Sequence, residues 1–279
     1  MTFIDSLRNY LSPQILVILC LGFISGVPYG VLMDPLNYWL SEEGIEKSTI
    51  GLLSLVFLIY SLKVFWAPLV DRLKIPRLHR LGQRKSWLFL SQLVTGLIIL
   101  SISFVEPKES LNIFVYLILA IGFFSATQDI CADALRIELV EKRELGEASA
   151  VFVIGWRIGA ILLSGVATFY IAEFFGWNFA YQMIGITVIF LSFIFLILIK
   201  EPTREIRPPK DFFKEPLGWF EDSFLAPLKD LYLRYKNHLL LLLLLIFTYR
   251  LSDMFLGPMA MPFYRETGFT KIEVAEITN

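Results

Sequence analysis

Eight charged residues lie inside long apolar segments of this chain, where a charge costs at least about 3 kcal/mol if lipid is the solvent. Four are acidic and four are basic: Asp34, Asp129, Asp133 and Asp253, and Lys63, Arg136, Arg157 and Arg250. Charged groups at membrane depth normally face a partner or a water-filled cavity. Their equal numbers indicate mutual neutralisation within a helix bundle, and each is a candidate functional residue.

Asp129 and Asp133 are four residues apart and share one helix face, with Gln128 beside them and Arg136 one turn further on. Asp129 lies deeper in its apolar segment and is the stronger candidate for proton coupling, with Asp133 as the second. Moving a cation such as Arg157 relative to Asp129 could switch its protonation. The alternative is that Asp129 only neutralises Arg157 and so holds two helices together.

Three basic residues, Lys63, Arg157 and Arg250, fall near the middle of their segments, where transporters hold their substrates. Together they would suit an anionic solute, although internal ion pairing, for example of Arg250 with Asp253, is the alternative. Gln128, Asp253 and Asp34 complete the candidate substrate-binding set. Aromatic rings that could stack on a sugar, or serve only in packing, are Tyr60, Trp66, Trp156 and Tyr249.

The elements that must position these residues are membrane helices. The 279 residues are 56% hydrophobic, with a mean hydropathy of +0.64, which no water-soluble domain of this size would carry. Residues 13–33, 87–105 and 181–199 are long apolar runs without a charge. Four more runs appear when interrupting charges are tolerated: 49–69, 111–135, 148–172 and 237–262. These continuous runs predict seven helices, since barrel strands would alternate apolar and polar residues.

Composition also excludes several classes. The formal charge of -1 argues against nucleic acid, and the two cysteines, Cys20 and Cys131, lie inside predicted spans and form no disulfide framework. The first apolar run is followed directly by a second and has no small-residue cleavage site, so it is not a secretory signal. We therefore expect a multi-pass protein held in a lipid bilayer.

Lys and Arg are distributed unevenly between the connecting loops. They gather after the second span, between residues 72 and 85, after the fourth span at 142–143, and between 200 and 236. The opposite loops carry only Lys47, Lys108, Arg265 and Lys271. The positive-inside rule predicts that the N-terminus and the basic loops are cytoplasmic.

The composition changes between residues 200 and 236, which are rich in proline and in charges of both signs. This segment predicts a cytoplasmic linker with a possible interfacial helix, between a six-helix bundle at 1–199 and the start of a second bundle at 237–279. A weak internal repeat supports the division, because 39–51 aligns without gaps on 263–275. Glu42 then matches Glu266, and Lys47 matches Lys271. Such parallel repeats predict a second half, which is expected to be missing beyond this truncated start.

Several segments resemble one known family, the AmpG-type muropeptide permeases, a branch of the major facilitator superfamily. The matching segments are Gly22 to Pro28, Ile50 to Leu55, Leu62 to Arg72, Ser125 to Ala134, Gly155 to Gly159 and Tyr249 to Asp253. The resemblance implies an all-α polytopic membrane protein, with a six-helix N-terminal bundle and the first helix of a second one. It also implies gating by Asp71, Arg72 and Arg84 in the loop after the second span, for which generic positive-inside charge is the alternative.

The family imports anhydromuropeptides, the sugar-peptide products of cell-wall turnover, across the bacterial inner membrane with protons. The resemblance therefore implies an anionic sugar-peptide solute, protons, the lipid bilayer and the missing C-terminal half of the same transporter as partners. The proton gradient would replace any cofactor. Asp129 matches the acid of the family's fourth span and is the implied proton-coupling residue.

Three alternatives stay open. Acetyl-CoA or another anionic solute is one, because related transporters share much of this pattern. Asp129 and Asp133 also have the spacing with which membrane transferases hold Mg²⁺, but those enzymes need a second acidic motif that this sequence lacks, so no enzyme and no metal site are expected. The third alternative is a truncated and inactive protein.

Overall fold

The computed structural model describes residues 12–201, 215, 218, 221 and 225–278, apart from some side chains in α6, α13, η7, α14 and α15. The elements up to residue 201 are α2 (Pro13–Leu32), α3 (Asp34–Glu42), α4 (Lys47–Leu53), η1 (Ser54–Val56), α5 (Phe57–Leu62), η2 (Lys63–Phe65), α6 (Ala67–Arg72), η3 (Leu78–Leu81), α7 (Gln83–Ile102), α8 (Leu111–Glu138), η4 (Lys142–Glu144), α9 (Leu145–Arg157), η5 (Ile158–Ala167), α10 (Thr168–Phe175) and α11 (Trp177–Leu198). Beyond them lie α13 (Ala226–Tyr235), η7 (Lys236–His238), α14 (Leu239–Glu266) and α15 (Lys271–Thr278). The η5 segment is a π-helix and the other η elements are 3₁₀-helices.

Six helical stretches of the described residues are long and apolar enough to cross a membrane. They are Pro13–Glu42, Lys47–Phe65, Gln83–Ile102, Leu111–Glu138, Lys142–Phe175 and Trp177–Leu198. Each contains or largely overlaps one of the first six predicted spans, and the seventh, 237–262, lies almost entirely within α14. The predicted all-α membrane architecture, a six-helix bundle followed by one further membrane helix, is confirmed.

The first span is longer than predicted, because α3 continues it from Asp34 to Glu42 after a break at Met33. Pro35 lies in the first turn of α3, where its missing N–H costs no helical hydrogen bond. Residues 35–41 are all buried although several are polar. The span predicted from hydropathy ends too early because polar residues such as Asn37 and Ser41 lower the hydropathy of this segment. In the structure, tertiary packing buries both side chains.

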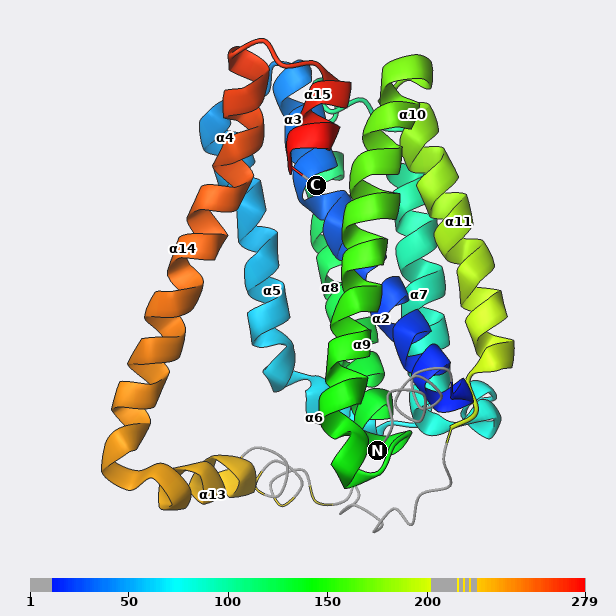
Figure 1. Ribbon diagram of the computed structural model, residues 1–279, viewed down its shortest axis with the longest axis vertical. Coiled ribbons are helices and arrows are strands. Elements are labelled where there is room, and N and C mark those ends of the chain that lie inside the picture. The colour runs from blue at the N-terminus through cyan, green and yellow to red at the C-terminus, as the bar shows by residue number, and fades with distance from the viewer. Residues whose placement is uncertain (1–11, 202–214, 216–217, 219–220, 222–224, 279) are drawn as a thin grey trace, which may run out of the picture.

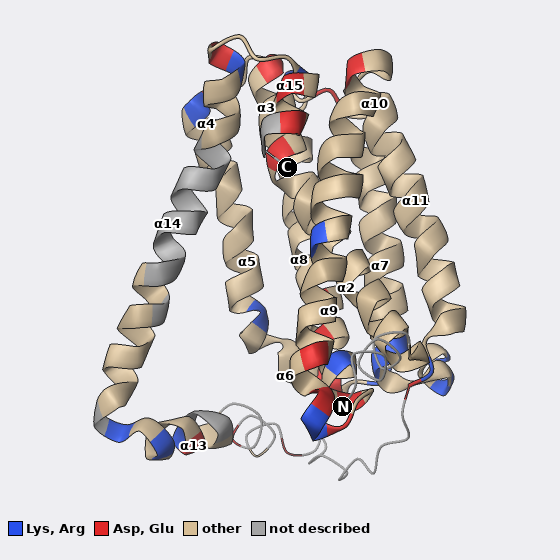
Figure 2. Ribbon diagram, in the orientation of Figure 1, with Lys and Arg blue, Asp and Glu red and all other residues tan. Residues whose placement is uncertain are grey.

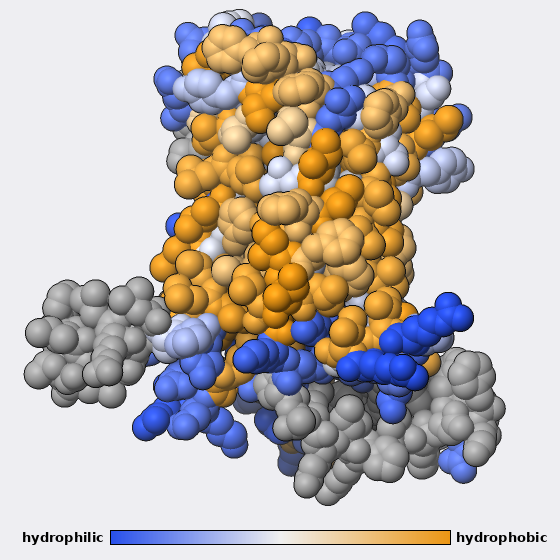
Figure 3. All heavy atoms as spheres, turned by 90° about the vertical axis from the view of Figure 1, so that its right-hand side faces the viewer, coloured by the Kyte–Doolittle hydropathy of each residue, from blue (hydrophilic) through white to orange (hydrophobic). Residues whose placement is uncertain are grey.

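The described residues of the basic loops lie at one end of the bundle, which we call the basic end, and the turns that follow α3 and α14 lie at the other, the hairpin end (Figure 1). Lys, Arg, Asp and Glu concentrate at these two ends (Figure 2). A band of hydrophobic side chains covers the face between them (Figure 3). In Figure 1, α14 meets α3 and α4 at the hairpin end and diverges from the bundle toward the basic end. Helices α7 and α11 pack together on the side away from α14.

Glycines allow α2 and α9 to approach closely. A Cβ added at Gly22 or Gly26 would overlap the backbone carbonyl of Phe152 or Trp156. On the facing helix, Gly155 would meet the carbonyl of Leu19 in the same way. Backbone therefore packs on backbone, as small residues spaced four apart permit in membrane helices.

We expect Gly26→Val to lower the stability of the detergent-solubilised protein by about 1–3 kcal/mol, because the neighbouring backbone cannot move aside as a flexible side chain would. A thermal unfolding curve measures the change. Gly146→Ala is the matched control, since a Cβ there meets no atom within 4 Å. A valine variant that unfolds like the parent would contradict the close approach of α2 and α9.

Candidate transport site

Four charged residues from two spans form one cluster, which we call the charge cluster: Lys63, Asp129, Asp133 and Arg136. The Lys63 ammonium forms an ion pair with Asp129 and lies 3.4 Å from a carboxylate oxygen of Asp133. Arg136 contacts the other oxygen of Asp133 at 3.2 Å. Two positive and two negative charges thus neutralise one another, as the equal numbers in the sequence predicted.

Local backbone structure presents Lys63 to α8. The second span tightens into the 3₁₀ segment η2 just where Lys63 begins it. Two hydrogen bonds flank the ion pair, from Tyr60 to Ser125 at 2.7 Å and from the Trp66 indole to Thr127 at 3.0 Å. These contacts fix α5 and η2 against the α8 face that carries Asp129, so the cluster is held from both sides.

The alternative in which Asp129 neutralises Arg157 is wrong, because Lys63 takes that position. Arg157 is exposed at the end of α9, and none of the ion pairs among the described residues includes it. Its exposed neighbours along the helix are apolar: Val153, Ile154, Ile158 and Leu162. Span four contacts span five instead through Arg136, whose guanidinium lies 4.8 Å from the ring centre of Phe152.

Aromatic rings from three spans meet beside this region. Tyr29 lies 5.3 Å from Tyr60, 5.2 Å from Trp156 and 4.9 Å from Phe57, measured between ring centres. These tilted and edge-on contacts stabilise the packing of α2, α5 and α9. Tyr60 and Trp156 were recognisable in the sequence as candidates, whereas Tyr29 was missed because nothing in its spacing marks it.

Two further candidate substrate residues, Gln128 and Asp34, do not join the charge cluster. Gln128 is fully buried and donates a hydrogen bond to the Ile24 carbonyl at 2.7 Å, which ties α8 to α2. Asp34 is partly buried at the start of α3, on the hairpin side of the bundle. The side chains of Arg250 and Asp253, and that of Tyr249, lie outside the described residues.

A second group of charges joins three loops at the basic end, and we call it the basic-end cluster: Asp71, Arg84, Glu138 and Glu201. The buried Arg84 guanidinium lies 3.3 Å from Asp71 and 2.7 Å from Glu138. Glu201 accepts the backbone N–H groups of Arg84 and Lys85, where α7 begins. The predicted gating residues Asp71 and Arg84 are therefore in contact, and the side chain of Arg72 lies outside the described residues.

Sequence reasoning missed Glu138 and Glu201. Each follows an apolar span at the basic end, but many acidic residues do so without a special role. A carboxylate at a helix N-terminus satisfies free N–H groups and complements the helix dipole, which explains the position of Glu201. Only the folded chain shows that three loop ends share Arg84.

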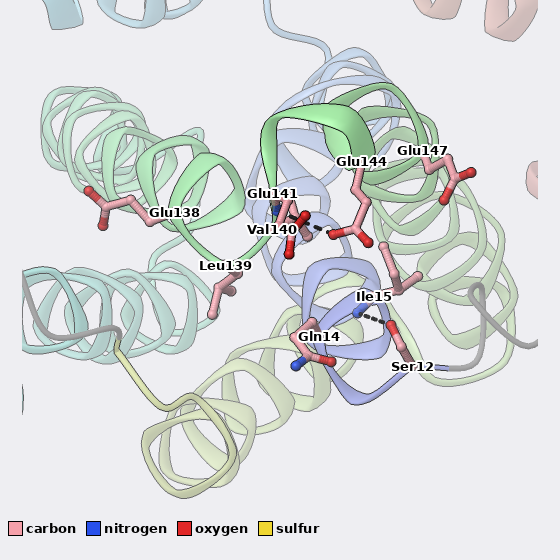
Figure 4. A pocket seen from close by; sticks show the side chains of 9 residues that line it. All are labelled: Ser12, Gln14, Ile15, Glu138, Leu139, Val140, Glu141, Glu144 and Glu147. Carbon is pink, nitrogen blue, oxygen red and sulfur yellow. Dashed lines mark hydrogen bonds between the residues drawn. The ribbon is translucent and has the colours of Figure 1, made fainter.

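A pocket of about 460 Å³ opens at the basic end between the starts of α2 and α9, and four glutamates line it, as Figure 4 shows. Its side chains come from Ser12, Gln14, Ile15, Glu138, Leu139, Val140, Glu141, Glu144 and Glu147. Glu141 and Glu144 form a reciprocal capping box at η4. Glu141 and Glu144 therefore have a local structural role, and a lining with four carboxylates does not suit an anion.

Comparison with known proteins gives consistent results. A family model described as Major Facilitator Superfamily matches residues 16–275. "Putative transporter AmpG 4" of Rickettsia felis is 39% identical over 261 residues, covering 93% of this chain and 62% of that protein. "Anhydromuropeptide permease" of Escherichia coli K12 is 34% identical over 272 residues, covering 97% of this chain and 52% of that protein. The chain thus spans about half to two thirds of the length of these relatives.

Among solved structures, this chain is similar to a bacterial homologue of the human lysosomal transporter Spinster. The match covers 82% of this chain and 55% of the homologue. The TM-score is 0.48 and the sequence identity is 16%.

Proposed function

Because this chain belongs to the major facilitator superfamily, we propose that it acts in a secondary active transporter that imports anhydromuropeptides by proton symport. The similarity to AmpG permeases supports the lineage and the solute class. Transport by alternating access needs two bundles that move against each other, so we propose that this six-helix bundle works with a second one.

The ion pair between Lys63 and Asp129 is the observation that carries the proposal. A carboxylate held by one lysine within a membrane span can exchange that partner for a proton. In the proposed cycle, a carboxylate of the solute forms an ion pair with Lys63 in place of Asp129, and Asp129 then binds a proton. The solute carboxylate then neutralises Lys63, and the proton neutralises Asp129. No unpaired charge is left within the membrane.

Arg157 supplies a second positive charge for the solute, since an exposed arginine among apolar residues requires a polar neighbour at that depth. The rings of Tyr60 and Trp156 offer apolar faces on which a sugar can stack. We also propose that the basic end faces the cytoplasm, as the positive-inside rule requires, in the inner membrane of a bacterium.

Uptake into membrane vesicles tests this proposal. The vesicles carry this bundle together with the second bundle that the proposal requires. Labelled anhydromuropeptide or labelled acetyl-CoA is added with and without an imposed proton gradient. We expect the muropeptide to accumulate only with the gradient, and a protonophore to abolish its accumulation. Gradient-driven uptake of acetyl-CoA alone would overturn the solute assignment, and accumulation that ignores the gradient would overturn proton symport.

A further inference from the structure

The internal repeat seen in the sequence is a structural repeat. Helix α3 ends at Glu42 and α4 begins at Lys47, while α14 ends at Glu266 and α15 begins at Lys271. The helix ends thus fall at matching positions of the two repeats. Between them, both turns reverse direction through a glycine with positive φ, 76° at Gly44 and 91° at Gly268.

The backbone hydrogen bonds of the two turns also match. In the first repeat, the N–H groups of residues 43, 44 and 45 donate to the carbonyls of residues 39, 41 and 40. In the second, residues 267, 268 and 269 donate to 263, 265 and 264 in the same order. The chain therefore builds one helix-turn-helix motif twice, and the two copies face each other at the hairpin end (Figure 1).

The two copies exchange ion pairs across their interface. Lys47 of the first lies 2.6 Å from Glu266 of the second, and Lys271 of the second lies 3.2 Å from Glu42 of the first. Because Lys47 corresponds to Lys271 and Glu42 to Glu266, the contact is reciprocal. This is the geometry of a self-complementary two-fold interface, made here within one chain.

The two pairs differ in surroundings. The side chains of Lys47 and Glu266 are 57% and 52% exposed, so this pair contributes little on its own. The Lys271 side chain is only 13% exposed, and its ammonium lies 5.2 Å from the ring centre of Trp177. The Trp177 indole also donates a hydrogen bond to Glu42. The Glu42–Lys271 pair is therefore the stronger one.

Further contacts join the same two elements. Tyr38 donates to the Phe269 carbonyl at 2.9 Å, and Arg265 donates to the carbonyl oxygens of Ser41 and Glu42 at the end of α3. Helix α15 is capped by Thr270 and Glu273, and the N–H of Thr270 holds the pKa of Glu273 below its usual range. The hairpin end is thus closed by polar contacts that can be broken in water.

We propose that the exchanged ion pairs Glu42–Lys271 and Lys47–Glu266 are a latch that keeps the hairpin end shut while α14 stands away from the bundle at the basic end. The latch rests on the proposed alternating access, since it must open for solute to enter from the hairpin side. Its two pairs break and form together, because each copy of the motif supplies one acid and one base. The Glu42–Lys271 pair beside Trp177, in which Lys271 is 13% exposed and Glu42 39%, sets the strength of closure.

Cross-linking measures closure without any solute. In vesicles carrying the chain with Cys20 and Cys131 replaced by serine, a short bifunctional thiol reagent joins Lys47→Cys to Glu266→Cys when the hairpin end is closed. This reporter replaces the exposed pair, so it measures closure by the Glu42–Lys271 pair. Adding Glu42→Gln or Lys271→Gln should reduce the cross-linking rate by about fivefold, as expected when the closed population falls. Glu43→Gln is the control, because Glu43 pairs with Lys108 at 3.7 Å outside the interface.

The charge exchange Glu42→Lys with Lys271→Glu should recover part of the lost rate, because an ion pair of opposite polarity can form, although the Trp177 contacts suit a glutamate at 42 and a lysine at 271. Unchanged cross-linking in the glutamine variants would overturn the latch. A reversed pair that cross-links no faster than the glutamine variants would also overturn it, since restoring opposite charges would then recover no closure. These readings do not depend on uptake, so a failed muropeptide assay leaves the latch test intact.

Discussion

Asp129→Asn is expected to lower gradient-driven uptake by about 100-fold, as for other positioned groups that carry a proton. Asparagine has nearly the same size and cannot take up a proton. Lys63 keeps Asp133 as its partner at 3.4 Å, so the bundle should remain folded. Solute exchange across the membrane at equal pH should persist, because it needs no net proton movement. The measurement is uptake with a gradient, compared with exchange without one.

Asp133→Asn is the matched comparison. The Asp133 side chain is 39% exposed against 22% for Asp129. We expect a smaller loss of coupled uptake from this change. Full gradient-driven accumulation in the Asp129 variant would show that the proton travels elsewhere. Equal loss of coupled uptake and of exchange would mean that Asp129 is only a structural partner of Lys63.

Arg84→Ala is expected to reduce stability by about 3–5 kcal/mol, the usual cost of removing one partner from a buried ion pair. The Arg84 side chain is only 7% exposed, and that of Glu138 is 13% exposed. Without the guanidinium, the carboxylates of Asp71 and Glu138 face each other across a partly apolar site. Thermal unfolding in detergent measures the loss.

Two variants make this second test specific. Lys85→Ala removes a neighbouring positive charge that forms no ion pair with another described residue, and it should unfold close to the parent. Arg84→Ala combined with Glu138→Gln should recover part of the loss, because the buried negative charge is removed as well. A double variant no more stable than Arg84→Ala would show that the arginine acts through packing and not through charge.

The sequence located the charged residues within the spans, but it did not identify their partners. Charges within apolar runs stand out because lipid makes them costly, so Lys63 and Asp129 were recognisable without a structure. Their pairing depends on how α5 and α8 rotate toward each other, which periodicity does not report. Arg157 was the nearest basic residue in the next span, yet the 3₁₀ segment at Lys63 brings a different cation to Asp129.

The helix boundaries also show which features hydropathy predicts and which depend on tertiary packing. The apolar runs identified six spans and α14, because membrane thickness dictates their length. The continuation of the first span into α3 was missed, since buried polar residues such as Asn37 do not register as hydrophobic. The sequence repeat aligned Glu42 with Glu266 and Lys47 with Lys271. That each glutamate pairs with the lysine of the other copy can be seen only in the structure, where the two motifs face each other.

The position of Trp177 has an optical consequence. Its indole stacks on Trp39 with ring centres 6.1 Å apart and planes inclined by only 12°, and Lys271 lies against it. Transitions of two nearly parallel indoles at this separation couple, and an adjacent positive charge shifts the emission of the ring. Trp39 and Trp177 both lie in the six-helix bundle, so their stacking does not depend on closure, whereas Lys271 belongs to the second copy of the motif. Departure of Lys271 from the Trp177 ring therefore changes the emission when the hairpin end opens, and a natural residue reports the opening without an attached dye.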